Sequence, residues 1–258
     1  MAIEIIALDE SEIEVHIQGK GEGVVLLSGM GTDVSALNKL SDRLNHAGYQ
    51  TIGINYRGIA GSTGPLEGAT LHDFSGDVAG VVKRLGMAPI HVVGAATGSR
   101  VARCLGTDFP EIVKTLTLLG AGGIVEPDPR AASALRRLYQ ADLSEHEQLE
   151  AARIALFSPV TDIEEVGMPM KPWPVIHQHV RIFLGTPVDE WWKGGDAPIH
   201  VIQGLDDRIA LPENGRKLYE QYRSRVHLSE IEDGGHVFFL ERPDVVADAV
   251  IAYLEKTA

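Results

Sequence analysis

Segments of strand length alternate with segments of helical periodicity along most of this 258-residue chain. The segment "GVVLLSG" (23–29) is an unbroken apolar run, as in a strand that is buried on both faces of a sheet. The segment after it (33–48) places Leu37, Leu40 and Leu44 at helical spacing. Strands that alternate with helices of this length form βαβ units, which predict a parallel sheet with right-handed crossovers.

Eight strands are expected, and the first two alternate apolar and polar residues as paired edge strands do. From about 124 to 195 the pattern changes to several helical stretches without a convincing strand. We therefore predict an α/β fold: a mostly parallel, doubly wound, eight-stranded sheet with helices on both faces and an all-helical cap inserted after the sixth strand. Residues 1–123 and 196–258 form the core domain in this prediction, and 124–195 form the cap. The expected strands are 3–8, 12–17, 23–29, 50–56, 89–94, 115–120, 198–204 and 225–231.

The bulk properties narrow the range of partners and compartments. A net charge of −13 argues against a nucleic-acid or anionic membrane surface. The single cysteine, Cys104, excludes an intrachain disulfide, and the first residues lack the pattern of a signal peptide. No apolar run reaches the length of a membrane span. We expect a cytoplasmic protein with a small-molecule partner, and a homodimer is possible.

Glycine-containing turns follow the expected strands at 23–29, 89–94, 198–204 and 225–231. Ligands of parallel sheets bind beyond the carboxyl ends of the strands, where these turns lie. "LLSGMGTD" lets the chain bend so that the amide of Met30 faces a cleft. "HVVGAATGSRVA" has Gly94 and Gly98 on either side of Ala96, the spacing of a sharp corner that exposes the residue at its tip. Asp207 in "GLDDRIALPEN" and His236 in "GGHVFFLERPD" each follow a later strand. The chain order is thus tip, acid, base.

Together these segments resemble the α/β-hydrolase family over nearly the whole chain. "GLDDRIALPEN" is similar to the family's acid loop, which puts the acid on Asp207, and "GGHVFFLERPD" is similar to its histidine loop, which puts the base on His236. The resemblance implies an oxyanion hole formed by the backbone amides of Met30 and Thr97, with the Thr97 side chain pointing elsewhere. It also implies a hydrolase of esterase or lactonase type. At the tip, Ala96 stands where the family has its nucleophile.

Three classes of function are compatible with Ala96. Alanine here is either a replacement introduced into a serine hydrolase or the native residue. In the first case the parent enzyme would hydrolyse a small apolar ester, lactone or related carbonyl compound. In the second, His236 and Asp207 would act without a covalent step, either by activating water to hydrolyse an activated bond or as in a lyase, an isomerase or a carbon–carbon bond enzyme. The third class is a non-catalytic receptor on this fold. The intact acid–histidine pair argues against a receptor, because binding alone does not need it.

Further residues are candidates for substrate binding. Ser28 ends a strand at the cleft, and Trp173, His177 and Trp191 fall in the predicted cap or at its return. His177 and His179 are two residues apart and so do not share a helical face, which argues against a metal site there. We predict no metal. The glycine-rich turns lack the phosphate-loop lysine and the third dinucleotide glycine, so no nucleotide cofactor is expected. Cys104 is expected to be buried as a small apolar residue.

Overall fold

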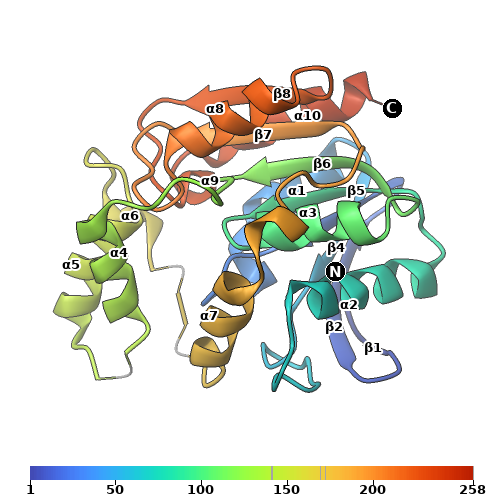
Figure 1. The fold of residues 1–258 in the computed structure, drawn as a ribbon, viewed down its shortest axis with the longest axis horizontal. Coiled ribbons are helices and arrows are strands. Elements are labelled where there is room, and N and C mark those ends of the chain that lie inside the picture. The colour runs from blue at the N-terminus through green and yellow to red at the C-terminus, as the bar shows by residue number, and fades with distance from the viewer. Residues whose placement is uncertain (141, 169, 172, 258) are drawn as a thin grey trace.

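The computed structural model describes residues 1–140, 142–168, 170–171 and 173–257. Its centre is one eight-stranded sheet in the order β1-β2-β4-β3-β5-β6-β7-β8 (Figure 1). Strand β1 pairs antiparallel with β2, and β2 pairs antiparallel with β4, whereas every later neighbour is parallel. The predicted mostly parallel α/β sheet is confirmed. The strands are β1 (Ala2–Ala7), β2 (Glu12–Gly19), β3 (Glu22–Leu27), β4 (Tyr49–Ile54), β5 (Ile90–Ala95), β6 (Val113–Leu119), β7 (Ile199–Gly204) and β8 (Val226–Ile231).

Helices cover both faces of this sheet, as the doubly wound prediction requires. One buried apolar cluster joins the strands to α2 (Leu71–Leu85), α3 (Gly98–Asp108) and α8 (Pro212–Gln221). A second cluster, on the other face, joins them to α1 (Asn38–His46) and α10 (Pro243–Lys256). All six residues of β5 and of β7 are buried, as in central strands of a parallel sheet, and the polar residues His91, His200 and Gln203 are buried among their apolar neighbours.

Local signals fix where the helices begin and end. Thr70 and Asp73 form a capping box at the start of α2, and Gly86 ends the helix in the left-handed conformation with φ of 66°. The 3₁₀ turn η1 (Val34–Leu37) precedes α1, and the side chain of Asp33 caps it. The short α9 (Phe238–Glu241) precedes α10.

Between β6 and β7 the described residues form helices and no strand. These are α4 (Pro129–Leu138), α5 (Glu145–Ala155), α6 (Ile163–Val166), α7 (Ile176–Gly185) and the 3₁₀ turn η2 (Val188–Glu190). Helices α4, α5 and α6 lie beyond the carboxyl end of the sheet, on the side to which the β6 arrow points (Figure 1). The insertion after the sixth strand is confirmed, and we keep residues 124–195 as its proposed limits. No helix in the described ranges is long and apolar enough to cross a membrane.

Buried histidines make the stability of this fold depend on pH. His200 on β7 is 1% exposed, and its Nε2 lies 2.8 Å from Ser229 Oγ. Burial lowers the pKa of His200 from 6.5 to about 3, and the nearby His227 and Lys256 act in the same direction. The folded protein therefore keeps this ring neutral at a pH where the unfolded chain binds a proton. As pH falls from 6.5 toward 3, this difference in proton binding favours unfolding.

We expect a His200→Gln variant to lose part of this acid sensitivity. Between pH 6 and 4, the slope of its free energy of unfolding against pH should be smaller than the wild-type slope by about 1.4 kcal/mol per pH unit. The reason is that the variant binds one proton fewer on unfolding. Urea titrations at several pH values measure the slope. His146→Gln, which removes an exposed histidine on α5, is the control and should keep the wild-type slope. Equal slopes for all three proteins would contradict the assignment.

Candidate functional site

The turn between β5 and α3 is a strained, tightly packed corner with Ala96 at its tip. Ala96 has φ of 50°, a left-handed conformation that is uncommon for residues other than glycine. A Cβ atom at Gly94 would lie 2.3 Å from the Gly98 carbonyl oxygen, and one at Gly98 would lie 2.4 Å from the Leu27 carbonyl oxygen. Glycine is therefore needed on both sides of the tip. The backbone has the shape that presents a nucleophile, while the tip carries only a methyl group.

Two loops at the carboxyl ends of β7 and β8 carry Asp207 and His236. They touch backbone to backbone, since the Asp206 amide donates to the Gly234 carbonyl at 2.9 Å. A Cβ atom at Gly204 would lie 2.4 Å from the same carbonyl oxygen, so no larger residue fits there. This close contact places Nδ1 of His236 at 2.9 Å from Oδ2 and 3.1 Å from Oδ1 of Asp207.

The carboxylate of Asp207 is held from several directions. The amides of Ile209 and Ala210 each donate to its Oδ1 at 2.8 Å, and Gln203 Nε2 donates to its Oδ2 at 3.5 Å. Asp207 is 1% exposed and His236 is 9% exposed. The neighbouring Asp206 instead accepts a hydrogen bond from Ser158 Oγ at 2.6 Å. Of the two adjacent aspartates, Asp207 is the one that orients the histidine.

The end of β6 brings the corner and the acid–histidine pair together. The Ala96 amide donates to the Leu119 carbonyl at 2.7 Å. The next residue, Gly120, has φ of 72°, and a Cβ atom there would lie 3.5 Å from Asp207 Oδ2 and 4.0 Å from His236 Cε1. Gly120 thus leaves room for the pair beside the strand that holds the corner. The sequence analysis did not identify Gly120, whose only signal is a glycine directly after a buried strand.

The Met30 amide is not free in this structure. It donates to the side-chain oxygen Oγ1 of Thr97 at 2.7 Å. The Thr97 side chain is thus directed at the Met30 amide, a contact that the sequence does not predict. The Thr97 amide itself donates to no atom of the described residues, so it is available to a bound oxygen.

The remaining predicted binding residues lie in different surroundings. Ser28 is 1% exposed, and its hydroxyl donates to the Thr32 carbonyl within its own turn at 3.4 Å. Trp191 is also 1% exposed, because its ring packs 4.6 Å from the Arg103 guanidinium in the core. His177 is exposed on α7, and no contact brings it to the corner. Of these three residues, the structure places only the backbone of Ser28 beside the corner, since a Cβ atom at Gly98 would lie 2.7 Å from the Ser28 carbonyl oxygen.

Trp173 lies on a segment that crosses the Met30 turn. The Lys171 amide donates to the Gly31 carbonyl at 2.9 Å, and the Trp173 amide donates to the Lys171 carbonyl at 2.9 Å. A Cβ atom at Gly31 would lie 2.6 Å from the Met170 Cε and 3.7 Å from the Ile176 Cδ1. Apolar side chains of the insertion therefore cover the turn that carries the Met30 amide. Sequence reasoning missed Met170, since a methionine between prolines carries no spacing signal.

Comparisons with known proteins identify the family of this chain. A model of the alpha/beta hydrolase family matches residues 24–249, and the chain belongs to that family. It is 28% identical over 220 residues to the protein BpoC of Mycobacterium tuberculosis, a match covering 80% of this chain and 83% of BpoC. It is 26% identical over 279 residues to a 2-hydroxy-6-oxononadienedioate/2-hydroxy-6-oxononatrienedioate hydrolase of a Pseudomonas species, covering 97% and 96% of the two chains. The solved structure of a thermophilic esterase from Thermogutta terrifontis is similar with a TM-score of 0.79 at 22% identity, covering 100% and 99% of the chains.

The packing of the corner predicts opposite effects for two glycine-to-alanine substitutions. Gly94→Ala should destabilise the protein by at least about 2 kcal/mol, because its Cβ has no space beside the Gly98 carbonyl. Gly76→Ala in the middle of α2 should stabilise it by about 0.5–1 kcal/mol, because a Cβ there meets nothing within 4 Å and alanine favours the helix. Chemical denaturation measures both values. Similar changes for the two variants would show that the corner is not tightly packed.

Proposed function

We propose that this chain is an enzyme that hydrolyses a small apolar ester, lactone or related carbonyl compound, with His236 as general base. The observation that carries the proposal is the buried Asp207–His236 pair, kept intact and fully hydrogen-bonded beside a corner whose tip is Ala96. Buried polar pairs are costly unless they are satisfied, and a protein that only binds ligands gains nothing from this one. The names of the relatives, which include a hydrolase and an esterase, support the same reaction class.

The hydrogen bond to Asp207 decides which histidine nitrogen acts as the base. Nδ1 faces the carboxylate at 2.9 Å and carries the proton, which leaves the lone pair on Nε2. His236 Nε2 accepts a proton from water, and the resulting hydroxide attacks the substrate carbonyl carbon. As the tetrahedral intermediate collapses, the imidazolium returns the proton to the leaving alkoxide. Ala96 forms no bond with the substrate in this scheme.

The carbonyl oxygen needs donors as negative charge develops on it. The amides of Thr97 and Met30 supply them, as the position of both residues beside the corner allows. In the protein without substrate, the Met30 amide donates its hydrogen bond to Thr97 Oγ1. A negatively charged oxygen displaces this neutral hydroxyl, because a charge-assisted hydrogen bond is about twice as strong as a neutral one.

The covering segment supports an apolar substrate. Met170 and Ile176 lie over Gly31, next to the Met30 amide, and Trp173 is half-buried in the same segment. Apolar walls with few polar groups are typical of pockets for small molecules. A substrate held here would place its carbonyl between the donors and His236, with its apolar part against the insertion.

A second mechanism uses the same base. The methyl group of Ala96 is no nucleophile, so His236 could equally remove a proton from a substrate carbon or oxygen, as in a lyase, an isomerase or a carbon–carbon bond enzyme. The observation that favours this alternative is again Ala96 beside an intact pair. The products separate the two mechanisms, because only hydrolysis incorporates one oxygen atom from labelled water into the acid product.

The test is the turnover of aryl esters and lactones by the wild-type chain and by two matched variants. Asp207→Asn keeps the shape of the carboxylate but not its charge, and should lower kcat by about 10²-fold or more with little change in KM. Asp206→Asn, one residue away, should leave kcat within about twofold, because Asp206 binds Ser158 rather than His236. Equal rates for wild type and Asp207→Asn would contradict the proposal. A compound that raises the Tm of the wild type without being consumed would favour the receptor class.

A further inference from the structure

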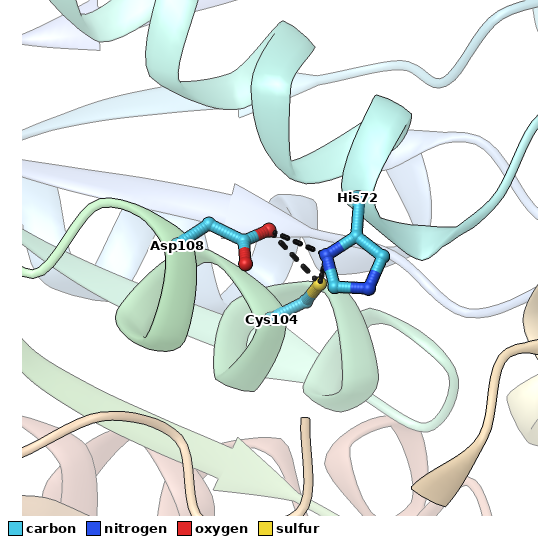
Figure 2. A group of neighbouring side chains, drawn as sticks. All are labelled: His72, Cys104 and Asp108. Carbon is cyan, nitrogen blue, oxygen red and sulfur yellow. Dashed lines mark hydrogen bonds and ion pairs between the residues drawn. The ribbon is translucent and has the colours of Figure 1, made fainter. Parts of the chain in front are cut away.

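A second polar cluster lies between α2, α3 and η2 and shares no residue with the Asp207–His236 pair. His72 on α2 points at Cys104 and Asp108, which are one turn apart on α3 (Figure 2). His72 Nδ1 lies 2.9 Å from Asp108 Oδ2 and 3.4 Å from Cys104 Sγ, and Sγ lies 3.3 Å from the same Oδ2. Three different kinds of donor atom therefore converge on one point.

This triangle has the size of one face of a zinc coordination sphere. Tetrahedral zinc bonds nitrogen and oxygen at about 2.0–2.2 Å and sulfur at about 2.3 Å, which separates its ligand atoms by about 3.3–3.6 Å. The two distances to Cys104 Sγ match this separation, and the His72–Asp108 distance is a few tenths of an ångström shorter. Histidine, cysteine and a carboxylate are also a donor set that suits zinc among divalent ions.

The far side of the His72 ring supplies an independent observation. Its Nε2 lies 2.8 Å from Glu190 Oε2 on η2. Histidines that bind metals almost always donate their second N–H to a carboxylate or carbonyl, which turns the lone pair of the first nitrogen toward the metal. With the Nε2 proton directed at Glu190, the Nδ1 lone pair of His72 faces Cys104 and Asp108.

Charge and access also suit a cation. Asp108 and Glu190 place two carboxylates around one histidine, and Ser75 Oγ donates to Asp108 Oδ2 at 2.7 Å. Cys104 is buried, while the side chains of His72 and Asp108 are 39% and 22% exposed and leave an entry path. Burial raises the pKa of the Cys104 thiol, and the two carboxylates add to the shift.

We propose that His72 Nδ1, Cys104 Sγ and Asp108 Oδ2 bind one Zn²⁺ ion, with Glu190 orienting His72 and a water molecule as the fourth ligand. Binding replaces the thiol proton of Cys104, which passes to solvent. The metal ties α2 and α3 to η2, the last turn before the chain returns to β7. The Leu71 amide already donates to Thr186 Oγ1 at 3.0 Å at the same junction. The site stabilises the attachment of the helical insertion and takes no part in the reaction proposed above.

Titration of the metal-stripped full chain with Co²⁺ tests the site without any activity assay. We expect one equivalent to produce a sulfur-to-cobalt charge-transfer band in the near ultraviolet, which only a thiolate ligand gives, and Zn²⁺ to abolish it by displacement. Cys104 is the single cysteine of the chain, so the band would identify its thiolate as the cobalt ligand. Absence of the band in the wild-type protein would overturn the proposal, whatever the variants do.

Variants then separate ligands from neighbours. Cys104→Ala should remove the band, and Glu190→Gln should weaken Zn²⁺ binding by about 10- to 100-fold, because it affects only the orientation of His72. The exposed-histidine control His146→Gln should bind as the wild type does. Circular dichroism checks that each variant is folded. Saturating Zn²⁺ should raise the Tm of the wild type by about 5 °C and leave that of Cys104→Ala unchanged. Zinc affinity that survives Cys104→Ala would place the metal elsewhere and overturn the proposal.

Discussion

The close approach of three backbone segments at the carboxyl edge of the sheet sets the geometry of everything around it. Gly98 packs against the Leu27 carbonyl, and Gly94 packs against Gly98. The Ala96 amide donates a hydrogen bond to the Leu119 carbonyl, so β3, β5 and β6 meet at one corner. A second backbone contact, between Gly204 and Gly234, joins the ends of β7 and β8. Because both contacts exclude side chains, the positions of the tip, the acid and the histidine are determined by the main chain. The residue at the tip can therefore change without moving its neighbours.

Features that depend on the main chain, such as buried strands and glycine turns, are the parts of the molecule that could be predicted from sequence. Buried parallel strands are short, mostly apolar segments, so the strand that the sequence predicts at 89–94 is found as β5 at Ile90–Ala95, with His91 as its one polar side chain. Glycines that permit sharp turns are also visible in the sequence, and they located the corner and the Asp207 and His236 loops. The site residues there remain proposals for function, but their placement around one sheet edge follows from the topology.

Other features depend on contacts that spacing along the chain does not reveal. Within the predicted all-helical insertion 124–195, residues 187–195 form only the short 3₁₀ turn Val188–Glu190, and Trp191 packs in the core against Arg103. The rotamer of Thr97 depends on the Met30 amide, 67 residues away in sequence. Likewise, His72 and Cys104 meet only because α2 packs on α3. No pattern within one helix indicates such pairs, so the prediction of no metal does not take into account the cluster at which we propose one.

We propose that His236, held by Asp207, is positioned to activate a group at the corner: water in the chain with Ala96, and a hydroxyl group if serine is introduced at residue 96. The most direct measurement is the mass of the intact Ala96→Ser protein after exposure to a fluorophosphonate. The account predicts one covalent adduct per chain at the introduced serine, none in the unmodified chain, and none when His236→Gln is added to Ala96→Ser. A folded Ala96→Ser protein that takes up no fluorophosphonate would contradict it, because the pair would then not be positioned to activate a group at the tip.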